Sequence, residues 1–231
     1  MKIFAFVFAR GGSKGLPGKN IMELDGKPLL KYSIDIARSI ESIEKIFVST
    51  DDSSIANIAR ENGAIVIERP KTLAEDNSPE WLAWQHSIQW VTENHGSFDY
   101  FVSLPATSPL RNKEDIENSI AKMQLEDADI CVAYTPANRS PYFNMVKVNE
   151  EGCLELVNKP DSAIVRRQDA PKVYDLTTVV YVSKPKHILE NFGLFSGRVA
   201  GIEVPKERAV DIDDIYDFRL AEIILRESKK K

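Results

Sequence analysis

The sequence is poor in cysteine and in histidine. Its 231 residues include two cysteines, Cys131 and Cys153, which are too few for a disulfide framework and lack the spacing of metal ligands. A reducing, cytoplasmic location is therefore expected. The three histidines, His86, His95 and His187, do not pair with a nucleophile or a ligand cluster in the sequence, so we assign them no chemistry.

An excess of positive charge and long hydrophobic runs are also lacking. Lys and Arg number 30 against 35 Asp and Glu, which gives a net charge of −5 and argues against nucleic-acid binding. No apolar run approaches the roughly 18 residues of a membrane span. The apolar start, residues 1–10, lacks a small-residue cleavage site and is expected to be a buried strand. We expect one domain over residues 1–231, with neither nucleic acid nor membrane as partner.

The sequence does contain a regular alternation of β-rich apolar runs and helical patterns. Asp52 or Ser53 is expected to cap one helix, and Ser78 with Pro79 predicts the cap and first position of another. Because the strands alternate with helices and lack polar alternation, they indicate an α/β fold with a mostly parallel sheet covered on both faces. The expected strands are residues 2–8, a run from residue 46, 64–68, 100–104, 129–134, 177–183 and 199–204.

The alternation is interrupted between residues 136 and 176. Residues 144–148 and 153–157, joined by a turn that contains Gly152, have the pattern of a β-hairpin. We interpret the segment as a small insertion on the α/β core.

The loop after the first strand, residues 9–20, carries the strongest chemical signal. In parallel α/β sheets ligands bind beyond the carboxyl ends of the strands. This loop combines glycines, which let backbone N–H groups approach an anion, with three cations, Arg10, Lys14 and Lys19. The combination suits the binding of a polyphosphate. The alternative interpretation is that residues 9–20 form a flexible, solvated basic loop without a ligand.

Two common phosphate-binding motifs are excluded. A Walker loop needs Lys followed by Ser or Thr and then a helix, whereas here Ser13 precedes Lys14 and Pro17 follows. The dinucleotide fingerprint needs three glycines, and only Gly12 and Gly15 have matching spacing.

The loop, read as ARGGSKGLPGKN, resembles the signature of the acylneuraminate cytidylyltransferases, the CMP-sialic acid synthetase family, which includes relatives acting on legionaminic and pseudaminic acids. The resemblance extends over nearly the whole chain through STDD at residues 49–52, Arg69-Pro70, TSPLR at 107–111, Arg167-Gln168 and DIDD at 211–214. It implies a Rossmann-like nucleotide-diphospho-sugar transferase fold. It also implies that CTP and a 2-keto-sugar acid are joined to a CMP-sugar with release of pyrophosphate and with Mg²⁺ as cofactor, by a homodimer.

The resemblance also implies roles for individual residues. Lys19, with Arg10 and Lys14, is the catalytic set, and Lys19 is expected to contact the α-phosphate as charge develops. Asp211 and Asp213 are expected to hold the metal. The remaining nucleotide contacts are expected to come from Gly12 and Ser13 at the triphosphate, Asn20 at the ribose, Arg69 at the cytosine, and Asp76 in the segment that passes the base.

Several of these residues have a second interpretation. Asp211 and Asp213 lie two apart, so an extended backbone points both at one ion, but Asp213 or Asp214 can instead cap the last helix. Arg69 can be a surface cation. Asp51 can orient the basic loop or bind nucleotide.

The acceptor side departs from the family pattern. Pro105 replaces the glutamine of the usual Leu-Gln-Pro-Thr-Ser-Pro-Leu-Arg, and residues 175–178, Asp-Leu-Thr-Thr, replace Arg-Pro-Asn-Gly. Both changes remove hydrogen-bonding groups, so a different acceptor is expected. The sugar-binding candidates are Arg111, Arg167, Gln168 and Thr177.

The acceptor groups also leave two alternatives open. Arg111 is expected to meet either the acceptor carboxylate or a phosphate. Arg167 and Gln168 are expected to lie over the sugar site, with the partner subunit as a possible source, and the alternative is that they belong to a solvated basic loop. The insertion 136–176 is expected to serve in dimerisation and as a lid. A CMP-Kdo-type cytidylyltransferase and a non-catalytic nucleotide-binding homologue are the alternative functions.

Overall fold

A seven-stranded sheet forms the centre of the computed structural model, which describes residues 1–159 and 164–229. Its strands lie in the order β11-β7-β10-β6-β1-β4-β5. β10 runs antiparallel to both of its neighbours, and the other pairs are parallel. The strands are β1 (Ile3–Phe8), β4 (Ile43–Thr50), β5 (Ile65–Glu68), β6 (Tyr100–Ser103), β7 (Ile130–Pro136), β10 (Tyr174–Ser183) and β11 (Val199–Glu203). The predicted α/β fold with a mostly parallel sheet is confirmed.

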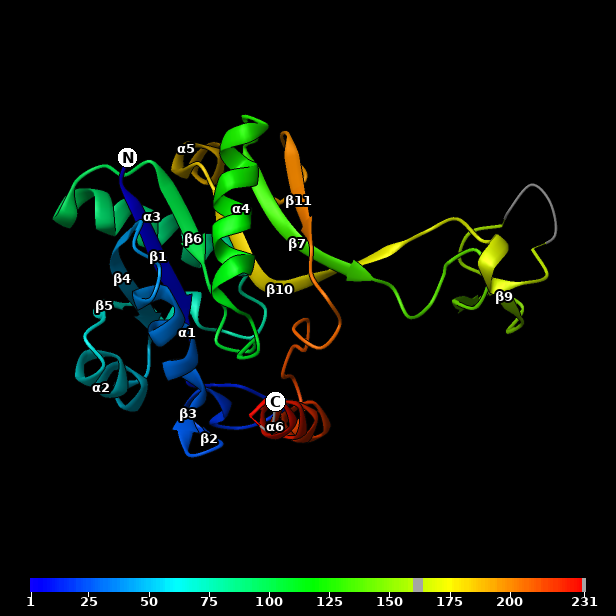
Figure 1. Cartoon of the computed structure of the whole chain (residues 1–231), viewed down its shortest axis with the longest axis horizontal. Helices are drawn as coiled ribbons and strands as arrows, with labels where there is room; N and C mark the ends of the chain where they lie inside the picture. The colour runs from blue at the N-terminus through cyan, green and yellow to red at the C-terminus, as the bar shows by residue number, and fades with distance from the viewer. Residues whose placement is uncertain (160–163, 230–231) are drawn as a thin grey trace.

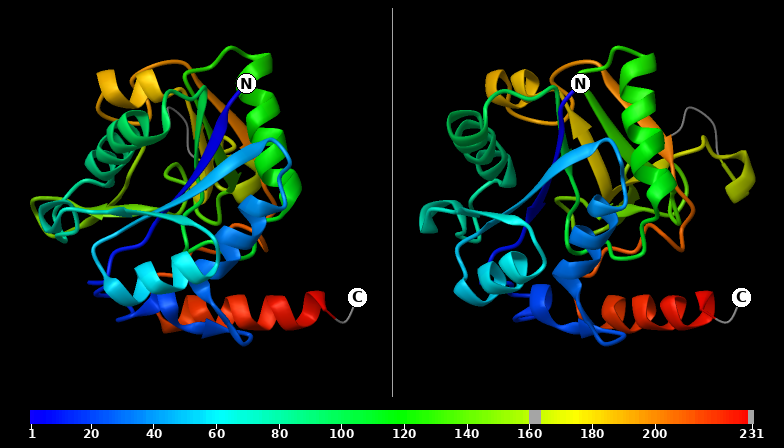
Figure 2. Two further views of the ribbon diagram at one scale, coloured as in Figure 1. Left: turned by 90° about the vertical axis from the view of Figure 1, so that its left-hand side faces the viewer. Right: turned by 60° about the vertical axis from the view of Figure 1, so that its left-hand side comes forward.

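Helices cover both faces of the sheet, as Figure 2 shows for α3 and α5 on one side and α4 on the other. Along β1, Ile3 and Ala5 pack toward α1 and α4, while Phe4 and Phe6 pack toward α3 and α5. This strand is buried on both faces, which explains why its sequence is continuously apolar. The helices are α1 (Leu29–Arg38), α2 (Ser53–Glu61), α3 (Glu80–His95), α4 (Lys113–Leu125), α5 (Pro185–Glu190) and α6 (Ile215–Ser228).

Local signals placed most helix ends correctly. Asp52 caps α2, accepting hydrogen bonds from Ser54 N at 2.8 Å and Ile55 N at 2.9 Å. The prediction for α3 was wrong by one residue: its N-cap is Pro79, no side chain caps it, and the helix begins at Glu80. Ser78 instead donates its backbone N–H to Glu75 O in the preceding turn.

The last helix and a small hairpin close the lower side of the core in Figure 1. β2 (Glu23–Leu24) and β3 (Lys27–Pro28) form a two-stranded sheet after the basic loop. Buried Leu24, Ile212 and Phe218 belong to one apolar cluster, so the chain before α6 is packed against the segment that follows the loop. This packing brings the segment around Leu24 against the segment around Ile212, which lies almost 190 positions later in the sequence.

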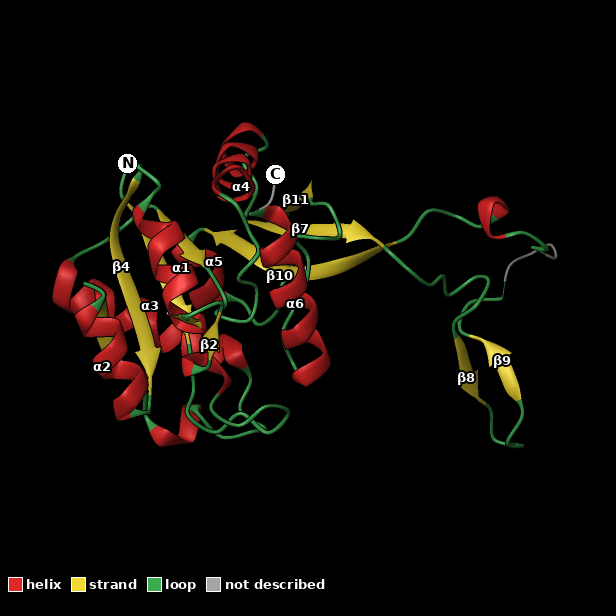
Figure 3. Ribbon diagram, turned by 60° about the horizontal axis from the view of Figure 1, so that its bottom comes forward, coloured by secondary structure: helices red, strands yellow, loops and turns green. Residues whose placement is uncertain are grey.

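The inserted segment projects from the core as an arm (Figures 1 and 3). β7 extends to Pro136 and β10 begins at Tyr174, so the described part of the arm comprises residues 137–159 and 164–173. The predicted hairpin is confirmed as β8 (Val146–Val148) paired with β9 (Leu154–Leu156). Residues 160–163 of the predicted insertion lie outside the described residues.

Candidate active site

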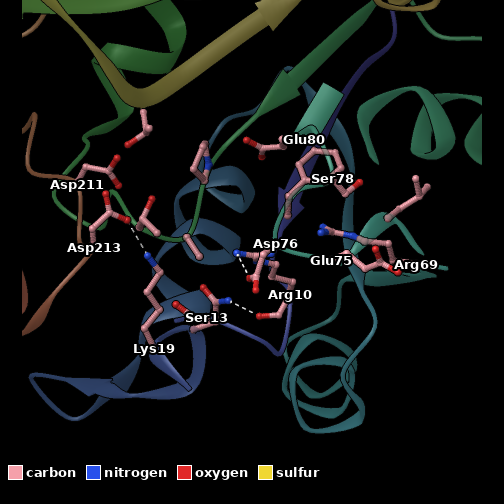
Figure 4. A pocket seen from close by; sticks show the side chains of 17 residues that line it. Arg10, Ser13, Lys19, Arg69, Glu75, Asp76, Ser78, Glu80, Asp211 and Asp213 are labelled. Atoms are coloured by element: carbon pink, nitrogen blue, oxygen red, sulfur yellow. Dashed lines mark hydrogen bonds and ion pairs between the residues drawn. The ribbon is translucent and has the colours of Figure 1, made fainter. Parts of the chain in front are cut away.

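A cavity of about 350 Å³ lies beyond the carboxyl ends of β1, β5 and β6. It is the position at which parallel α/β sheets bind ligands. Figure 4 shows the basic loop on one side of it and the acidic segment before α6 on another. The lining residues are Phe8, Arg10, Ser13, Lys19, Asn20, Arg69, Leu73, Glu75, Asp76, Ser78, Glu80, Pro105, Ala106, Thr107, Thr178, Asp211 and Asp213.

Two glycines allow the basic loop to approach acidic segments closely. A Cβ on Gly15 would collide with the backbone oxygen of Asp213, so a larger residue there must displace backbone. A Cβ on Gly11 would lie 2.8 Å from Asp52 Oδ2. Gly11 N also donates to Asp51 Oδ1 at 3.1 Å, so Asp51 orients the loop as one of its two interpretations proposed.

Lys19 joins the basic loop to the acidic segment. It begins the short 3-10 helix η1 (Lys19–Ile21), and its side chain is only 12% exposed. Its Nζ donates to Ile212 O at 2.7 Å and lies 3.0 Å from Asp213 Oδ1. These two contacts restrict the rotamers of Lys19, so its ammonium group is held in position at the cavity.

Asp211 and Asp213 both line the cavity, as the metal-site interpretation requires. Asp211 Oδ1 is buried and has no hydrogen-bond partner among the described residues. Burial raises the pKa of Asp211, and hydrogen bonding from Thr107 opposes this. Asp214 caps α6 through a capping box with Asp217, so the capping interpretation is confirmed for Asp214 and leaves Asp211 and Asp213 free to face the cavity.

Arg10 and Lys14 converge on Asp76. Arg10 Nη2 lies 3.1 Å from Asp76 Oδ1, and Lys14 Nζ lies 2.6 Å from Asp76 Oδ2. The hydrogen bond from Lys14 lowers the pKa of Asp76. Lys14 and Gly12 stand just outside the residues that line the cavity, whereas Ser13 lies within them.

Arg69 and Asn20, the two residues predicted to contact cytosine and ribose, both line the cavity. The interpretation of Arg69 as a surface cation was wrong, because the residue is 8% exposed. Its Nε donates to Ser49 Oγ at 3.1 Å and its Nη2 to Ser49 O at 2.8 Å, while the guanidinium lies over the Phe8 ring. Asn20 Nδ2 donates to Arg10 O at 3.0 Å.

On the acceptor side, Thr178 faces the cavity and Thr177 does not. Thr177 is buried and its hydroxyl donates to Ala133 O at 3.2 Å, while Thr178 Oγ1 lies 2.6 Å from Ser108 Oγ. The register between β10 and β7 shifts just after Thr177, and neighbouring residues of a strand point to opposite faces. The choice of Thr177 was therefore wrong by one position.

Arg111 lies beneath the cavity wall and not among its lining residues. It is 6% exposed. Its Nη1 donates to Ser33 Oγ at 2.8 Å, and its Nη2 donates to Pro105 O. The geometry corrects the expected acceptor contact: the guanidinium supports the backbone at Pro105, just before the TSPLR segment.

Arg167 and Gln168 lie in the arm, in the 3-10 helix η3 (Arg167–Asp169). They line a separate cavity of about 480 Å³ at the root of the arm. Arg167 Nη2 donates to Asn138 O at 3.0 Å. The structure does not bring these residues to the core cavity of the same chain.

Sequence reasoning missed several residues of the cavity. Thr107 follows β6 at the ligand edge of the sheet, and its place in TSPLR could have identified it. Glu75 and Glu80 flank the start of α3 and also line the cavity. No local pattern distinguishes them from solvated acids, because only the packing of α3 brings them to this edge.

Comparisons with known proteins place the chain in a family. Residues 4–219 match the family model described as cytidylyltransferase. The chain is 30% identical to CMP-N,N'-diacetyllegionaminic acid synthase of Campylobacter jejuni over 97% of this chain and 95% of that protein. It is 29% identical to N-acylneuraminate cytidylyltransferase of Escherichia coli, of which the chain covers 53%.

Among solved structures, a CMP:2-keto-3-deoxy-manno-octonic acid synthetase complexed with CTP superimposes with a TM-score of 0.72 at 14% identity, over 99% of this chain and 100% of that one. This likeness concerns the fold. Together with the family match over most of the sequence, it leads to one conclusion: the chain belongs to the cytidylyltransferase family.

Proposed function

We propose that the protein transfers CMP from CTP to a nonulosonic, sialic-acid-like 2-keto-sugar acid and releases pyrophosphate. The observation that carries the proposal is the meeting of the basic loop and the acidic segment in one cavity. Lys19 lies 3.0 Å from Asp213, although 194 residues separate them in sequence. A cationic loop and paired carboxylates at one site suit a nucleoside triphosphate bound with a divalent cation.

In the proposed reaction the anomeric hydroxyl oxygen of the sugar acid forms a bond to the α-phosphorus of CTP. The bond from this phosphorus to the bridging oxygen breaks in line, pyrophosphate leaves with its electron pair, and the hydroxyl proton is lost to solvent. Lys19, with its Nζ fixed by Ile212 O, neutralises charge that grows on the phosphate oxygens. Arg10 and Lys14 bind the outer phosphates. Ser13 and Gly12 add loop contacts to them.

The base and ribose are assigned to the opposite end of the cavity. Arg69 is held by Ser49 beside Phe8, so its guanidinium is a fixed donor for the oxygen and ring nitrogen of cytosine. Asn20, which the resemblance assigns to the ribose, and Asp76 also line the cavity.

The residues present fit a divalent cation, which we propose to be Mg²⁺. Asp211 Oδ1 is a buried carboxylate oxygen without a hydrogen-bond partner among the described residues, and Asp213 lies beside it on the cavity wall. No cluster of three or more His, Cys, Asp or Glu suited to a metal occurs in residues 1–159 and 164–229. Two protein carboxylates completed by phosphate oxygens and waters are typical of Mg²⁺. The bound cation supplies charge stabilisation at the reacting phosphate.

The acceptor class rests on the relatives and on the wall of the cavity. The two relatives are named for a diacetyllegionaminic acid and for N-acylneuraminate. In this chain Pro105, Ala106, Thr107 and Thr178 line the acceptor side, so hydroxyl and apolar groups stand where the family resemblance implies amide and guanidinium donors. An acceptor other than N-acetylneuraminate fits this wall better.

The arm supports a homodimer in which it covers the partner's site. Val148 is 67% and Leu154 is 70% exposed on the β8–β9 hairpin, and a two-stranded hairpin is marginally stable alone. Arg167 and Gln168 lie on this arm and are not among the residues that line the core cavity of the same chain. We infer that a second copy covers the apolar hairpin and that these two residues reach the sugar in the partner's cavity.

We also assign the protein to the cytoplasm, where CTP is available. Cys131 and Cys153 are both free thiols, as in a reducing compartment. No helix in the described part of the chain is long and apolar enough to cross a membrane.

A pyrophosphate-release assay with CTP, Mg²⁺ and a panel of 2-keto-sugar acids tests the function. Turnover with a nonulosonic acid is the expected result. Turnover with Kdo alone would assign the CMP-Kdo-type activity, and CTP binding without turnover for any acceptor would assign a non-catalytic nucleotide-binding protein.

A further inference from the structure

The two cations at the outer part of the basic loop are already paired with a carboxylate from across the cavity. Asp76 belongs to the segment between β5 and α3, whereas Arg10 and Lys14 belong to the loop after β1. Each oxygen of Asp76 engages one cation: Oδ1 lies 3.1 Å from Arg10 Nη2, and Oδ2 lies 2.6 Å from Lys14 Nζ. One carboxylate thus bridges the two cations to which we assign the outer phosphates.

Arg10 binds the same segment a second time, because its Nη1 donates to Ala74 O at 3.3 Å. Figure 4 shows Arg10 and Asp76 together in the cavity, joined by a dashed line. An anion that binds both Arg10 and Lys14 therefore meets N–H groups that Asp76 and Ala74 already occupy. The two carboxylate oxygens present the same acceptor chemistry as two phosphate oxygens.

These ion pairs are exposed enough to be displaced. The side chains of Arg10, Lys14 and Asp76 are 33%, 79% and 41% exposed, and exposed pairs contribute little stability each. Asp76 remains ionised at neutral pH, because the hydrogen bond from Lys14 lowers its pKa. A polyphosphate carries more charge than one carboxylate and can replace it at both cations.

We propose that Asp76 is an internal competitor of the polyphosphate: it occupies Arg10 and Lys14 in the empty site, leaves them when CTP binds and returns as pyrophosphate departs. This rests on the proposed function, which assigns the polyphosphate to the basic loop. It differs from the direct nucleotide contact that the sequence predicted for Asp76. A direct contact makes Asp76 favourable for binding, and competition makes it unfavourable.

Glu75 offers a matched control. It is the adjacent residue, lines the same cavity and carries the same charge, and it forms no ion pair with the residues that the structure describes. Glu75→Gln therefore removes one negative charge from the cavity without freeing Arg10 or Lys14. A difference between Glu75→Gln and Asp76→Asn isolates the competition from the general electrostatic effect.

The experiment is calorimetric titration of inorganic pyrophosphate, at low and at high salt, into the full chain and its variants. We expect Asp76→Asn and Asp76→Ala to bind pyrophosphate about three- to tenfold tighter than the wild type, the effect of removing two exposed ion pairs. Glu75→Gln is expected to change the affinity less than about twofold, and the gain from Asp76→Asn is expected to shrink at high salt.

Two outcomes would overturn the competition. Equal or weaker pyrophosphate binding by both Asp76 variants, with CTP still bound by the wild type, removes the competitor role and leaves the proposed function intact. If Glu75→Gln gains as much affinity for pyrophosphate as Asp76→Asn does, the effect comes from net charge alone and the competition is overturned. If the wild type binds neither pyrophosphate nor CTP, the proposed function fails as well, which separates the two failures.

Discussion

The core cavity and the arm are built in opposite ways. In the cavity, Lys19 and Asp213 are held within hydrogen-bond distance although they stand near opposite ends of the sequence. On the arm, the β8–β9 hairpin pairs residues that are close in sequence. Val148, Leu154 and Val165 are 67%, 70% and 83% exposed there. The comparison teaches that one chain by itself brings together the residues of the core cavity, whereas the arm carries apolar surface that the same chain leaves uncovered. We therefore expect nucleotide chemistry to respond to core variants and acceptor use to respond to arm variants.

The largest effect is expected from Lys19→Ala in the core. Turnover in the pyrophosphate-release assay should fall on the order of a hundredfold or more, because a charge contact made in the transition state is lost. Lys113→Ala on α4, where the lysine pairs only with Glu117 on its own helix among the described residues, serves as a remote control. Normal turnover in Lys19→Ala would remove this residue from the mechanism.

Asp211→Asn is expected to lower activity while it raises thermal stability at neutral pH. Activity and Mg²⁺ affinity are expected to fall about ten- to a hundredfold, the range for disturbed metal sites. Burial raises the pKa of Asp211, so ionising it favours the unfolded chain, and its cost to stability grows as pH rises above the ordinary pKa of the carboxyl.

Asp211→Asn should therefore unfold at higher temperature than the wild type at neutral pH, with the difference disappearing in acid. Thermal unfolding across pH checks this direction, and metal titration checks the site. An unchanged metal titration would clear Asp211 of the proposed role.

Arg167→Ala tests the arm. The KM for the sugar acid is expected to rise about tenfold through loss of a charged hydrogen bond, while CTP binding without acceptor stays unchanged. Arg166→Ala is the matched control, because Arg166 is occupied by Asp169 at 2.8 Å. Equal effects on CTP and on the sugar acid would contradict the division between core and arm, and sedimentation of the same proteins would report whether the dimer persists.

Gly15→Ala should give the smallest effect. The added Cβ meets the backbone oxygen of Asp213, so the loop must shift, and we expect a loss of about 1 kcal/mol in the free energy of unfolding, at the low end for overpacking. A Cβ on Gly12 meets nothing within 4 Å, so Gly12→Ala should leave stability within about 0.5 kcal/mol. Denaturant unfolding of the two variants measures the difference, and equal stability would mean that the loop and the acidic segment are not in close contact.

The sequence predicted those features that depend on neighbouring residues. The capping of α2 by Asp52 and the β8–β9 hairpin both follow from short-range rules, and the structure has them where expected. The basic loop was also recognised, because its glycines and cations are adjacent in sequence. The start of α3 failed by one residue, since Ser78 takes part in a turn that competes with capping.

Side-chain direction was the weakest part of the prediction. Thr177 and Thr178 are chemically identical, and a register shift in β10 decides which of them faces the cavity. Arg111 ends a motif that reads as substrate-binding, yet Ser33 and Pro105 hold it beneath the wall. Neither outcome is visible in a local pattern, because each depends on a partner strand or helix distant in sequence.

By itself, the sequence determined the alternation of strands and helices, the glycine-rich, cationic character of the first loop and the acidic character of the segment before α6, because hydrophobic period, glycine content and charge are local properties. Only the tertiary structure decided that Lys19 meets Asp213, that Asp76 bridges Arg10 and Lys14, and that Arg167 stands apart from the core cavity. The reason is physical: such contacts form where packing of the sheet and of α6 brings distant backbone together, and the burial that drives this packing is a property of the whole chain.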